Sequence, residues 1–402
     1  MQWPLGCTLQ AVGQTARAAM HHILLGIVML AASALGALGQ PALLEADDQG
    51  GLRKDGKPFR AIGINYFSCF YRTLLDGDDT SYEQGFEALA REGIPFVRFA
   101  ATGFWPKDMA LYRSDREEYF RRLDAVVASA EKHGIGLIPS LFWYYACVPD
   151  LVGEPLDQWG NPESKVHAWM REYVREVVTR YRDSPAIWAW EMGNEFALQA
   201  SLPNAAAHRA PIWPNLDTAD SRSERDDLSF DMLRVAYTEF GKEVREHDKK
   251  RMIFTGDSLP RPAAWHMERE GTWTEDNERQ FRQMLRSLNP DPIDAISIHA
   301  YGENTGRIAW AVRAAKSIKK PLFIGEFGVP GTGPEVKEEF RRMLRIIEES
   351  PVPLAALWVF DLPSQNADYN ITTDNERSYQ LREVAEANAR VQKGTAPSDR
   401  GP

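Results

Sequence analysis

The stretch Ala186-Ile-Trp-Ala-Trp-Glu-Met-Gly-Asn-Glu195 is a short apolar run that ends in two polar residues. Its length and its aliphatic and aromatic side chains are typical of a strand buried in a sheet. The dipeptide Asn-Glu occurs three times in the chain, beginning at residues 194, 277 and 375, but only the first occurrence closes an apolar run. Polar side chains directly after a buried strand indicate a functional site at the carboxyl edge of a sheet.

Seven further apolar or β-branched runs lie before and after this segment and alternate with longer amphipathic stretches. Alternation of this kind is typical of repeated β-α units around a parallel sheet. We expect eight strands, at residues 61–65, 96–100, 136–142, 187–193, 252–255, 295–299, 322–325 and 355–360. The amphipathic stretches predict helices at residues 116–133, 164–182, 227–247, 278–288, 307–318, 335–349 and 379–387.

Eight strands that are each followed by a helix predict an α/β fold, a (β/α)8 TIM barrel in a single domain. Insertions at residues 196–226 and 256–275 follow strand ends, on the side where such barrels build their sites. Residues 50–59, with Asp55-Gly56 at their centre, predict a hairpin that closes the opposite end. A doubly wound open sheet is the alternative, but Gly63-Ile-Asn-Tyr-Phe-Ser after the first strand is not a glycine-rich phosphate loop.

The N-terminal residues 1–39 are predicted to be an export signal peptide. Residues 23–38 form an uncharged apolar run that is followed by small residues, as signal peptidase requires. A membrane anchor is the alternative, but the run is shorter than the roughly 20 residues that span a bilayer. We therefore expect a secreted or periplasmic protein without stable membrane insertion. The barrel domain would occupy residues 40–395, and residues 396–402 would form a C-terminal tail.

The cysteines leave two possibilities open. Cleavage near residue 39 would remove Cys7 and leave Cys69 and Cys147. These two could form a disulfide outside the cytoplasm, since they follow the first and third strands, whose loops could meet. Two separate buried thiols are the alternative.

The composition excludes several kinds of ligand. The 47 Lys and Arg residues against 57 Asp and Glu give a net charge of −10, so no basic surface for a nucleic acid is indicated. No group of His, Cys and Asp has zinc-ligand spacing and no Gly-x-Ser-x-Gly motif occurs. We therefore expect neither a metal, nor another cofactor, nor a serine nucleophile.

Polar and aromatic residues at the predicted strand ends define a candidate site. Glu195 and Glu326 end the fourth and seventh strands, and these ends lie on one face of a barrel. Two facing carboxylates suit glycoside hydrolysis with retention, in which one attacks the anomeric carbon and the other acts first as acid and then as base. Glu191 should face the barrel interior and pair with Arg98, because a buried charge needs a partner. The full set is Tyr66, Arg98, Trp143, Asn194, Glu195, His299, Tyr301, Glu326 and Trp358.

These residues stand in motifs that resemble those of glycoside hydrolase family 5, the cellulase and β-mannanase family of retaining (β/α)8 enzymes. The resemblance implies that Glu195 is the acid/base and Glu326 the nucleophile. It also implies that Arg98, Asn194, His299, Tyr301 and Trp358 surround the reacting sugar. The motifs, in strand order, are Val97-Arg98-Phe99, Trp190-Glu-Met-Gly-Asn-Glu195, Ser297-Ile-His299-Ala-Tyr301, Ile324-Gly-Glu326-Phe-Gly and Leu357-Trp358.

The chemistry of these side chains agrees with the implied roles. Arg98 and Tyr301 favour the ionised form of Glu326, while burial and the nearby charge of Glu326 keep Glu195 protonated. Asn194 can donate a hydrogen bond to the sugar 2-hydroxyl, which strengthens in the transition state. The aromatic residues expected to contact the substrate are Trp358, Trp143 and Tyr66.

The end of the third strand bears on the substrate. Many family 5 cellulases carry a histidine there, whereas this chain reads Ser140-Leu-Phe-Trp-Tyr-Tyr145. The mannanase-like branch also lacks that histidine, so the resemblance favours an endo-β-1,4-glycanase acting on β-mannan over one acting on glucan. We expect the protein to be a monomer. The alternatives are an exo-acting β-glycosidase of the same clan and a non-catalytic carbohydrate-binding barrel. The expected partner is a polysaccharide or an oligosaccharide.

Overall fold

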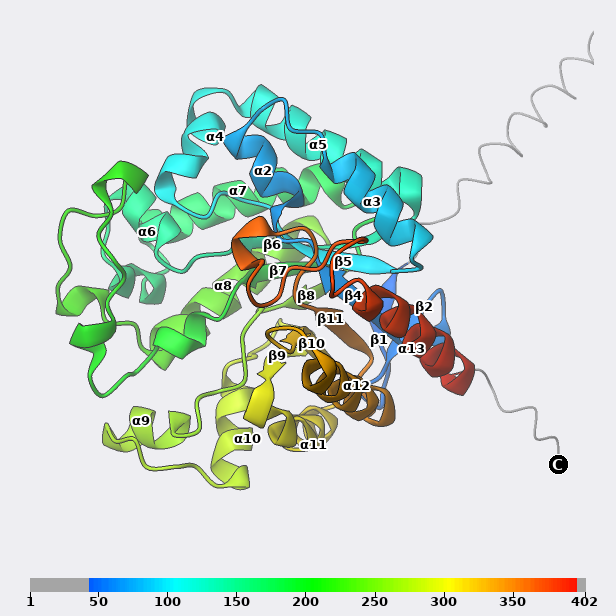
Figure 1. Ribbon diagram of the computed structural model, residues 1–402. Helices are drawn as coiled ribbons and strands as arrows, with labels where there is room; N and C mark the ends of the chain where they lie inside the picture. The colour runs from blue at the N-terminus through cyan, green and yellow to red at the C-terminus, as the bar shows by residue number, and fades with distance from the viewer. Residues whose placement is uncertain (1–42, 396–402) are drawn as a thin grey trace, which may run out of the picture. The chain divides into compact units, whose positions relative to one another are not determined.

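Eight parallel strands form the central sheet of the computed structural model, which describes residues 43–395 (Figure 1). They are hydrogen-bonded in the order β8-β7-β6-β5-β4-β11-β10-β9, which confirms the predicted barrel of β-α units. The strands are β4 (Ala61–Asn65), β5 (Phe96–Ala100), β6 (Gly136–Phe142), β7 (Ala189–Gly193), β8 (Met252–Phe254), β9 (Ile296–Tyr301), β10 (Leu322–Gly328) and β11 (Leu354–Leu357).

The strand sequences are continuous apolar runs because both faces of the sheet are covered by other parts of the protein. Every residue of β4, β5 and β6 is buried. One face packs against the helices and the other packs inside the barrel, so neither set of alternating side chains meets water. The observed strand ends lie within three residues of the predicted ones.

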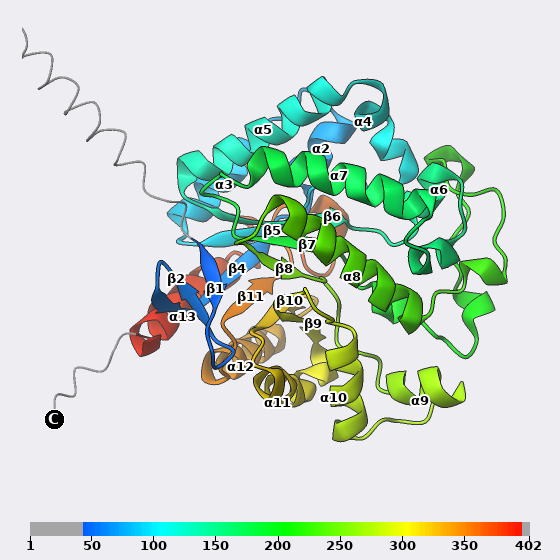
Figure 2. The same ribbon diagram turned by 180° about the vertical axis from the view of Figure 1, so that it is seen from behind.

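The helices lie around the outside of the sheet (Figures 1 and 2). They are α2 (Ser68–Leu75), α3 (Tyr82–Arg91), α4 (Ala110–Ser114), α5 (Arg116–His133), α6 (Cys147–Val152), α7 (Lys165–Tyr181), α8 (Phe230–His247), α9 (Ala264–Glu270), α10 (Glu278–Ser287), α11 (Ile308–Ile318), α12 (Pro334–Glu349) and α13 (Tyr379–Thr395). Ser164 and Ser229 accept hydrogen bonds from N–H groups in the first turns of α7 and α8. Gly134 ends α5 in the left-handed conformation.

A small antiparallel sheet closes the amino end of the barrel. It consists of β1 (Leu44–Ala46), β2 (Leu52–Lys54) and β3 (Lys57–Phe59). Asp55 and Gly56 both have positive φ in the turn between β2 and β3, as a two-residue hairpin requires, so the predicted hairpin is confirmed. The ring of Phe59 packs edge-on against Trp188, 5.6 Å between centroids, at the start of the strands.

Side chains join β8 to β9, where no regular strand ladder forms. The backbone N–H of Ile253 donates to Asp294 at 2.7 Å, and the N–H of Asp294 donates to the carbonyl of Ile253 at 3.0 Å. The Oδ1 atom of Asn289 accepts from the Thr255 hydroxyl at 3.1 Å and from the Ser297 N–H at 3.2 Å. These bonds replace the missing ladder because β8 is only three residues long.

The two long insertions lie after β7 and β8, as predicted. The first contains η3 (Phe196–Gln199), η4 (Ala205–His208), η5 (Pro214–Leu216) and η6 (Glu224–Asp226), and the second contains α9. A buried ion pair fastens the first insertion to α6, with Arg222 Nη1 2.6 Å from Asp150 Oδ1. The surplus length therefore builds structure at the carboxyl end of the strands.

Several predictions concern the ends of the chain and the cysteines. The predicted signal peptide and C-terminal tail lie outside residues 43–395. Within that range, no helix combines the length and apolar character needed to cross a bilayer.

Cys69 and Cys147 are both buried free thiols, and burial raises the pKa of each. Of the two alternatives, the structure contains separate thiols.

Substituting Asn289→Ala should lower the free energy of unfolding by about 1–3 kcal/mol, because the Ser297 N–H would be left buried without an acceptor. Urea denaturation of both proteins measures the difference. The exposed Asn204→Ala is the control and should stay within about 0.5 kcal/mol of the wild type. Equal stability of all three proteins would show that Asn289 does not join β8 to β9.

Candidate active site

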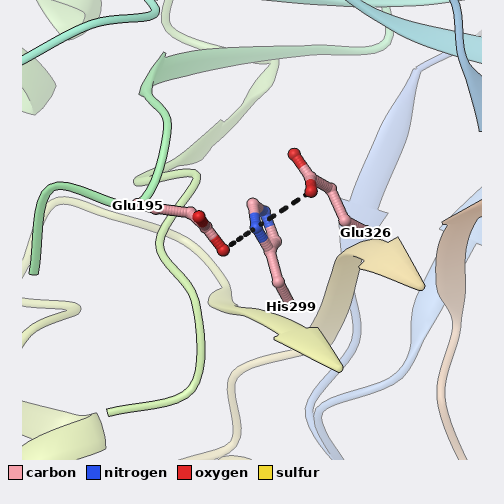
Figure 3. Close-up of side chains that lie close together, drawn as sticks. All are labelled: Glu195, His299 and Glu326. Carbon is pink, nitrogen blue, oxygen red and sulfur yellow. Dashed lines mark hydrogen bonds and ion pairs between the residues drawn. The ribbon is translucent and has the colours of Figure 1, made fainter. Parts of the chain in front are cut away.

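Glu195, His299 and Glu326 meet at the carboxyl end of the barrel (Figure 3). One carboxylate oxygen of each glutamate and a ring nitrogen of His299 all lie within 4.8 Å of one another. The Nδ1 atom of His299 is 2.9 Å from Oε1 of Glu195 and 3.6 Å from Oε2 of Glu326. The structure therefore brings together the two carboxylates that the sequence places on one face.

A β-bulge aims Glu326 into the barrel. The pairing of β10 with β9 skips one β10 residue, Gly325, so the alternation of side chains reverses there. Phe323 belongs to the apolar cluster inside the barrel, whereas Phe327 packs in the core that includes the helices. A Cβ atom on Gly325 would fall 2.8 Å from Nε2 of His299, so the glycine also makes room for the imidazole.

Arg98 is fully buried and binds several members of the site through one guanidinium. Its Nη1 donates to Oε1 of Glu326 at 2.8 Å, and its Nε donates to Oε1 of Glu191 at 2.7 Å. The predicted pair of Arg98 and Glu191 is thus confirmed. Its Nη2 donates to Oδ1 of Asn194 at 2.8 Å. One rigid cation of β5 therefore positions a residue of β7, a residue directly after β7 and a residue of β10.

The contact with Arg98 also orients the Asn194 amide. A guanidinium only donates hydrogen bonds, so the Asn194 atom that faces it must be the oxygen. The Nδ2 group then points away from Arg98 and has no hydrogen-bond partner in the part of the chain that the structure describes. It is left available to donate to a ligand.

His299 is a neutral ring. Burial lowers its pKa to about 3, although Glu326 opposes this shift. A neutral imidazole carries one N–H, and Nδ1 faces two carboxylates whereas the buried Nε2 has no partner. The proton therefore belongs on Nδ1, where it donates to Glu195 without adding positive charge.

The two carboxylates have different environments. Burial raises the pKa of the Glu195 carboxyl, and Arg98 and Arg261 lower it only in part. Glu326 accepts from Arg98 and, at 2.7 Å, from the hydroxyl of Tyr301. Burial and the Glu326 charge raise the pKa of Tyr301, so this hydroxyl keeps its proton. Glu195 is thus suited to hold a proton, whereas Glu326 is held in place by two hydrogen-bond donors.

Aromatic rings form one side of the site. Trp358 is partly exposed, and its ring stacks on Trp143 at 6.1 Å. Trp143 is only 4% exposed and covers the Arg98 guanidinium at 4.5 Å from its ring centroid. The geometry therefore offers Trp358 to a ligand, while Trp143 mainly supports it and shields the cation. Trp358 and Val359 are joined by a cis peptide bond.

Tyr66 does not reach the surface of the site, contrary to the expectation that it contacts substrate. It is completely buried, and its ring packs against Phe86 and Phe360. It follows Asn65, which faces the barrel interior, so alternation turns Tyr66 toward the helices. Its hydroxyl donates to Asp361 at 3.4 Å, so Tyr66 contacts the loop after β11 through both its ring and its hydroxyl.

Two polar residues next to the site were not among the predicted site residues. Asn65 accepts from Arg98 at 3.1 Å and donates to the carbonyl of Gly325 at 2.9 Å, directly before Glu326. Asp257 is 2% exposed and accepts from the Ala197 N–H at 2.9 Å. Both stand at predicted strand ends, and that position is the signal that could have identified them.

Glu195, His299 and Glu326 are also the one group of His, Cys, Asp and Glu side chains within residues 43–395 that is close enough to hold a metal ion. The positive charge of Arg98, 2.8 Å from Glu326, opposes a cation there. The proton on Nδ1 of His299 occupies the atom that would coordinate it. The arrangement therefore fits acid-base chemistry better than metal binding.

Substituting Arg98→Met should lower the free energy of unfolding by about 3–5 kcal/mol, because Glu191 would remain buried without its cation. Chemical denaturation measures this change. The exposed pair of Arg91 and Glu87 provides the control, since Arg91→Met should have little effect. A small loss in Arg98→Met would mean that the buried charges do not depend on the guanidinium.

The imidazole of His299 should stay neutral from about pH 4.5 to 8 in ¹⁵N NMR spectra, whereas in the urea-unfolded protein it should titrate near 6.5. The folded state then binds fewer protons than the unfolded state below pH 6.5. The contribution of His299 to stability is therefore complete above pH 6.5 and is lost as the pH falls toward 3. A folded-state titration near 6.5 would contradict this assignment.

Comparisons with known proteins agree with this geometry. The sequence profile described as "Cellulase (glycosyl hydrolase family 5)" matches residues 52–360. An Aspergillus flavus protein named "Probable mannan endo-1,4-beta-mannosidase A" is 42% identical over 161 residues, which are 35% of this chain and 40% of that protein. Another, named "Probable mannan endo-1,4-beta-mannosidase F", is 43% identical over 81 residues, 19% of this chain and 17% of that protein. The chain thus spans less than half the length of these curated relatives.

Two solved structures share the fold. The endo-1,4-beta-mannanase from Rhizomucor miehei aligns with a TM-score of 0.62 at 18% identity, over 87% of this chain and 100% of that one. The exo-beta-1,4-mannosidase Op5Man5 from Opitutaceae bacterium strain TAV5 aligns with a TM-score of 0.59 at 18% identity, over 88% of this chain and 64% of that one. Since the profile matches well over half of the chain, the protein belongs to glycoside hydrolase family 5.

Proposed function

We propose that the protein is a retaining endo-β-1,4-glycanase whose substrate is β-mannan. One observation carries the proposal: oxygens of Glu195 and Glu326 lie within 4.8 Å of each other across the end of the barrel. Retaining enzymes hold their carboxyl groups about 5–5.5 Å apart, whereas inverting enzymes leave about 6.5–9.5 Å for a water. The short separation supports a covalent intermediate.

In the first step, an oxygen of Glu326 attacks the anomeric carbon of the sugar. The glycosidic C–O bond breaks, its electron pair goes to the leaving oxygen, and Glu195 donates its proton to that oxygen. Burial raises the pKa of Glu195, which supports its role as the acid. Arg98 and Tyr301 hold Glu326 in position as an anion before the attack.

In the second step, Glu195 removes a proton from water, and the water oxygen attacks the anomeric carbon. The bond to Glu326 breaks, its electron pair returns to the carboxylate, and Glu195 is protonated again. The free amide N–H of Asn194 is suited to donate to the sugar 2-hydroxyl in both steps. The partly exposed ring of Trp358 is suited to stack on the sugar, supported by Trp143.

The relatives support mannan as the substrate, because both Aspergillus proteins are named as mannan endo-1,4-beta-mannosidases. The end of β6 supports it as well, since residues 140–145 contain no histidine, whereas many cellulases of the family carry one at the end of this strand. We also propose that residues 1–39 export the enzyme and that it acts as a monomer on a polysaccharide or an oligosaccharide. An exo-acting β-glycosidase would use the same chemistry, so product analysis must distinguish the two modes.

Wild-type enzyme should release sugar from mannan or glucomannan more readily than from carboxymethylcellulose, with a rapid fall in viscosity that marks endo cleavage. Glu326→Ala should lower kcat on the order of 10⁴-fold or more, since it removes the nucleophile. Proton NMR of fresh product should show the β-anomer before mutarotation. Reducing-sugar assays and viscometry provide the other measurements.

Glu335→Ala removes an exposed carboxylate and is the control, with activity expected near that of the wild type. Release of monosaccharide without loss of viscosity would favour the exo-acting reading. Failure of the wild type on every β-glycan would refute the enzymatic proposal and favour a carbohydrate-binding barrel. Full activity of Glu326→Ala would refute the assignment of the nucleophile.

A further inference from the structure

The residues after β8 hold the turn that carries Glu195. Three consecutive residues after β8 accept hydrogen bonds from alternate N–H groups, the first at the end of β7 and the other two in the turn that follows it. The bonds are Gly193 N–H to Thr255 carbonyl at 3.1 Å, Glu195 N–H to Gly256 carbonyl at 3.0 Å and Ala197 N–H to Asp257 Oδ1 at 2.9 Å. We call residues 255–257 the clamp.

The turn needs such support because of its backbone conformation. Glu195 has φ 56° and ψ 30°, a left-handed conformation that is strained for a residue other than glycine. Such conformations persist when surrounding contacts determine them. The clamp lies in direct contact with the turn, since a Cβ atom on Gly256 would fall 1.9 Å from the carbonyl oxygen of Gly193.

Asp257 is the clamp residue that binds the turn through its side chain. Its second oxygen accepts from the hydroxyl of Tyr237 in α8, so the carboxylate links the Glu195 turn to the helix layer. The group is buried, and burial raises its pKa to about 7. The proposed reaction does not use Asp257, and a buried carboxyl without a role would be costly to retain.

We propose that Asp257 is a positioning residue for Glu195, holding the Ala197 N–H so that the Glu195 carboxyl is aimed at the leaving-group oxygen. The proposal rests on the proposed function, in which Glu195 donates a proton in the first step. Loss of the Asp257 contact should therefore impair cleavage of substrates whose leaving group needs that proton. Substrates with a leaving group that departs as an anion should be spared.

The test compares kcat/KM for a β-mannooligosaccharide with kcat/KM for its 2,4-dinitrophenyl glycoside. Asp257→Ala should lower the first on the order of 10²-fold, the effect of misplacing a catalytic group, and the second by no more than about threefold. Asp257→Asn should restore both to within about threefold of the wild type, because the amide oxygen still accepts from Ala197 and the amide N–H can donate to Tyr237. If Asp257→Ala does not fold, Asp257→Leu fills the same space without an acceptor.

Asp248→Ala is the matched control. Asp248 is a buried carboxyl before β8 that accepts from the Trp190 indole of β7 at 2.9 Å, at the opposite end of these strands. Its loss should lower the melting temperature and leave the ratio of the two kcat/KM values unchanged. The proposal is refuted if Asp257→Ala lowers both values equally, or if Asp257→Asn is as impaired as Asp257→Ala. If the wild type cleaves neither substrate, the proposed function fails and this proposal fails with it.

Discussion

The guanidinium of Arg98 is the constraint on which the active site depends. It is a positive charge with no exposure to solvent, and a buried ion is tolerated only when opposite charges and hydrogen bonds compensate the lost hydration. Glu191 and Glu326 supply two negative charges from different strands, at 2.7 and 2.8 Å. The position of Glu326 is therefore part of the charge balance of the barrel interior as well as of its chemistry.

The same charge balance distinguishes the proposed roles of Glu195 and Glu326. Glu326 lies against Arg98 and Tyr301, so its anion is bound on two sides. Glu195 lies farther out, and its histidine neighbour is neutral because burial lowers the pKa of His299. A carboxyl group beside a neutral imidazole keeps its proton more readily than one beside a cation. In the proposed mechanism, two identical side chains thus acquire acid and nucleophile characters from their surroundings.

The sequence could predict the strands and most of the site, because carboxyl ends of parallel strands meet at one edge and the polar residues there stand out from apolar runs. The sequence could not predict, for every strand residue, whether its side chain faces the barrel interior or the helices. The bulge at Gly325 reverses the alternation along β10, so Phe323 and Glu326 both face inward. The prediction that Tyr66 contacts substrate was wrong for a different reason. Tyr66 directly follows the inward-facing Asn65, so regular alternation turns its side chain toward the helices, where it is buried.

The shortness of β8 connects the fold to the proposed acid. With three residues, β8 forms no regular ladder with β9, and Asn289 and Asp294 supply the missing bonds with their side chains. The chain leaves the sheet after Phe254, so the carbonyls of residues 255 and 256 can turn toward the Glu195 loop. A longer β8 would direct these groups into a regular ladder, and the left-handed conformation of Glu195 would lose its support. The irregular part of the barrel therefore supports the turn that carries Glu195, the proposed acid.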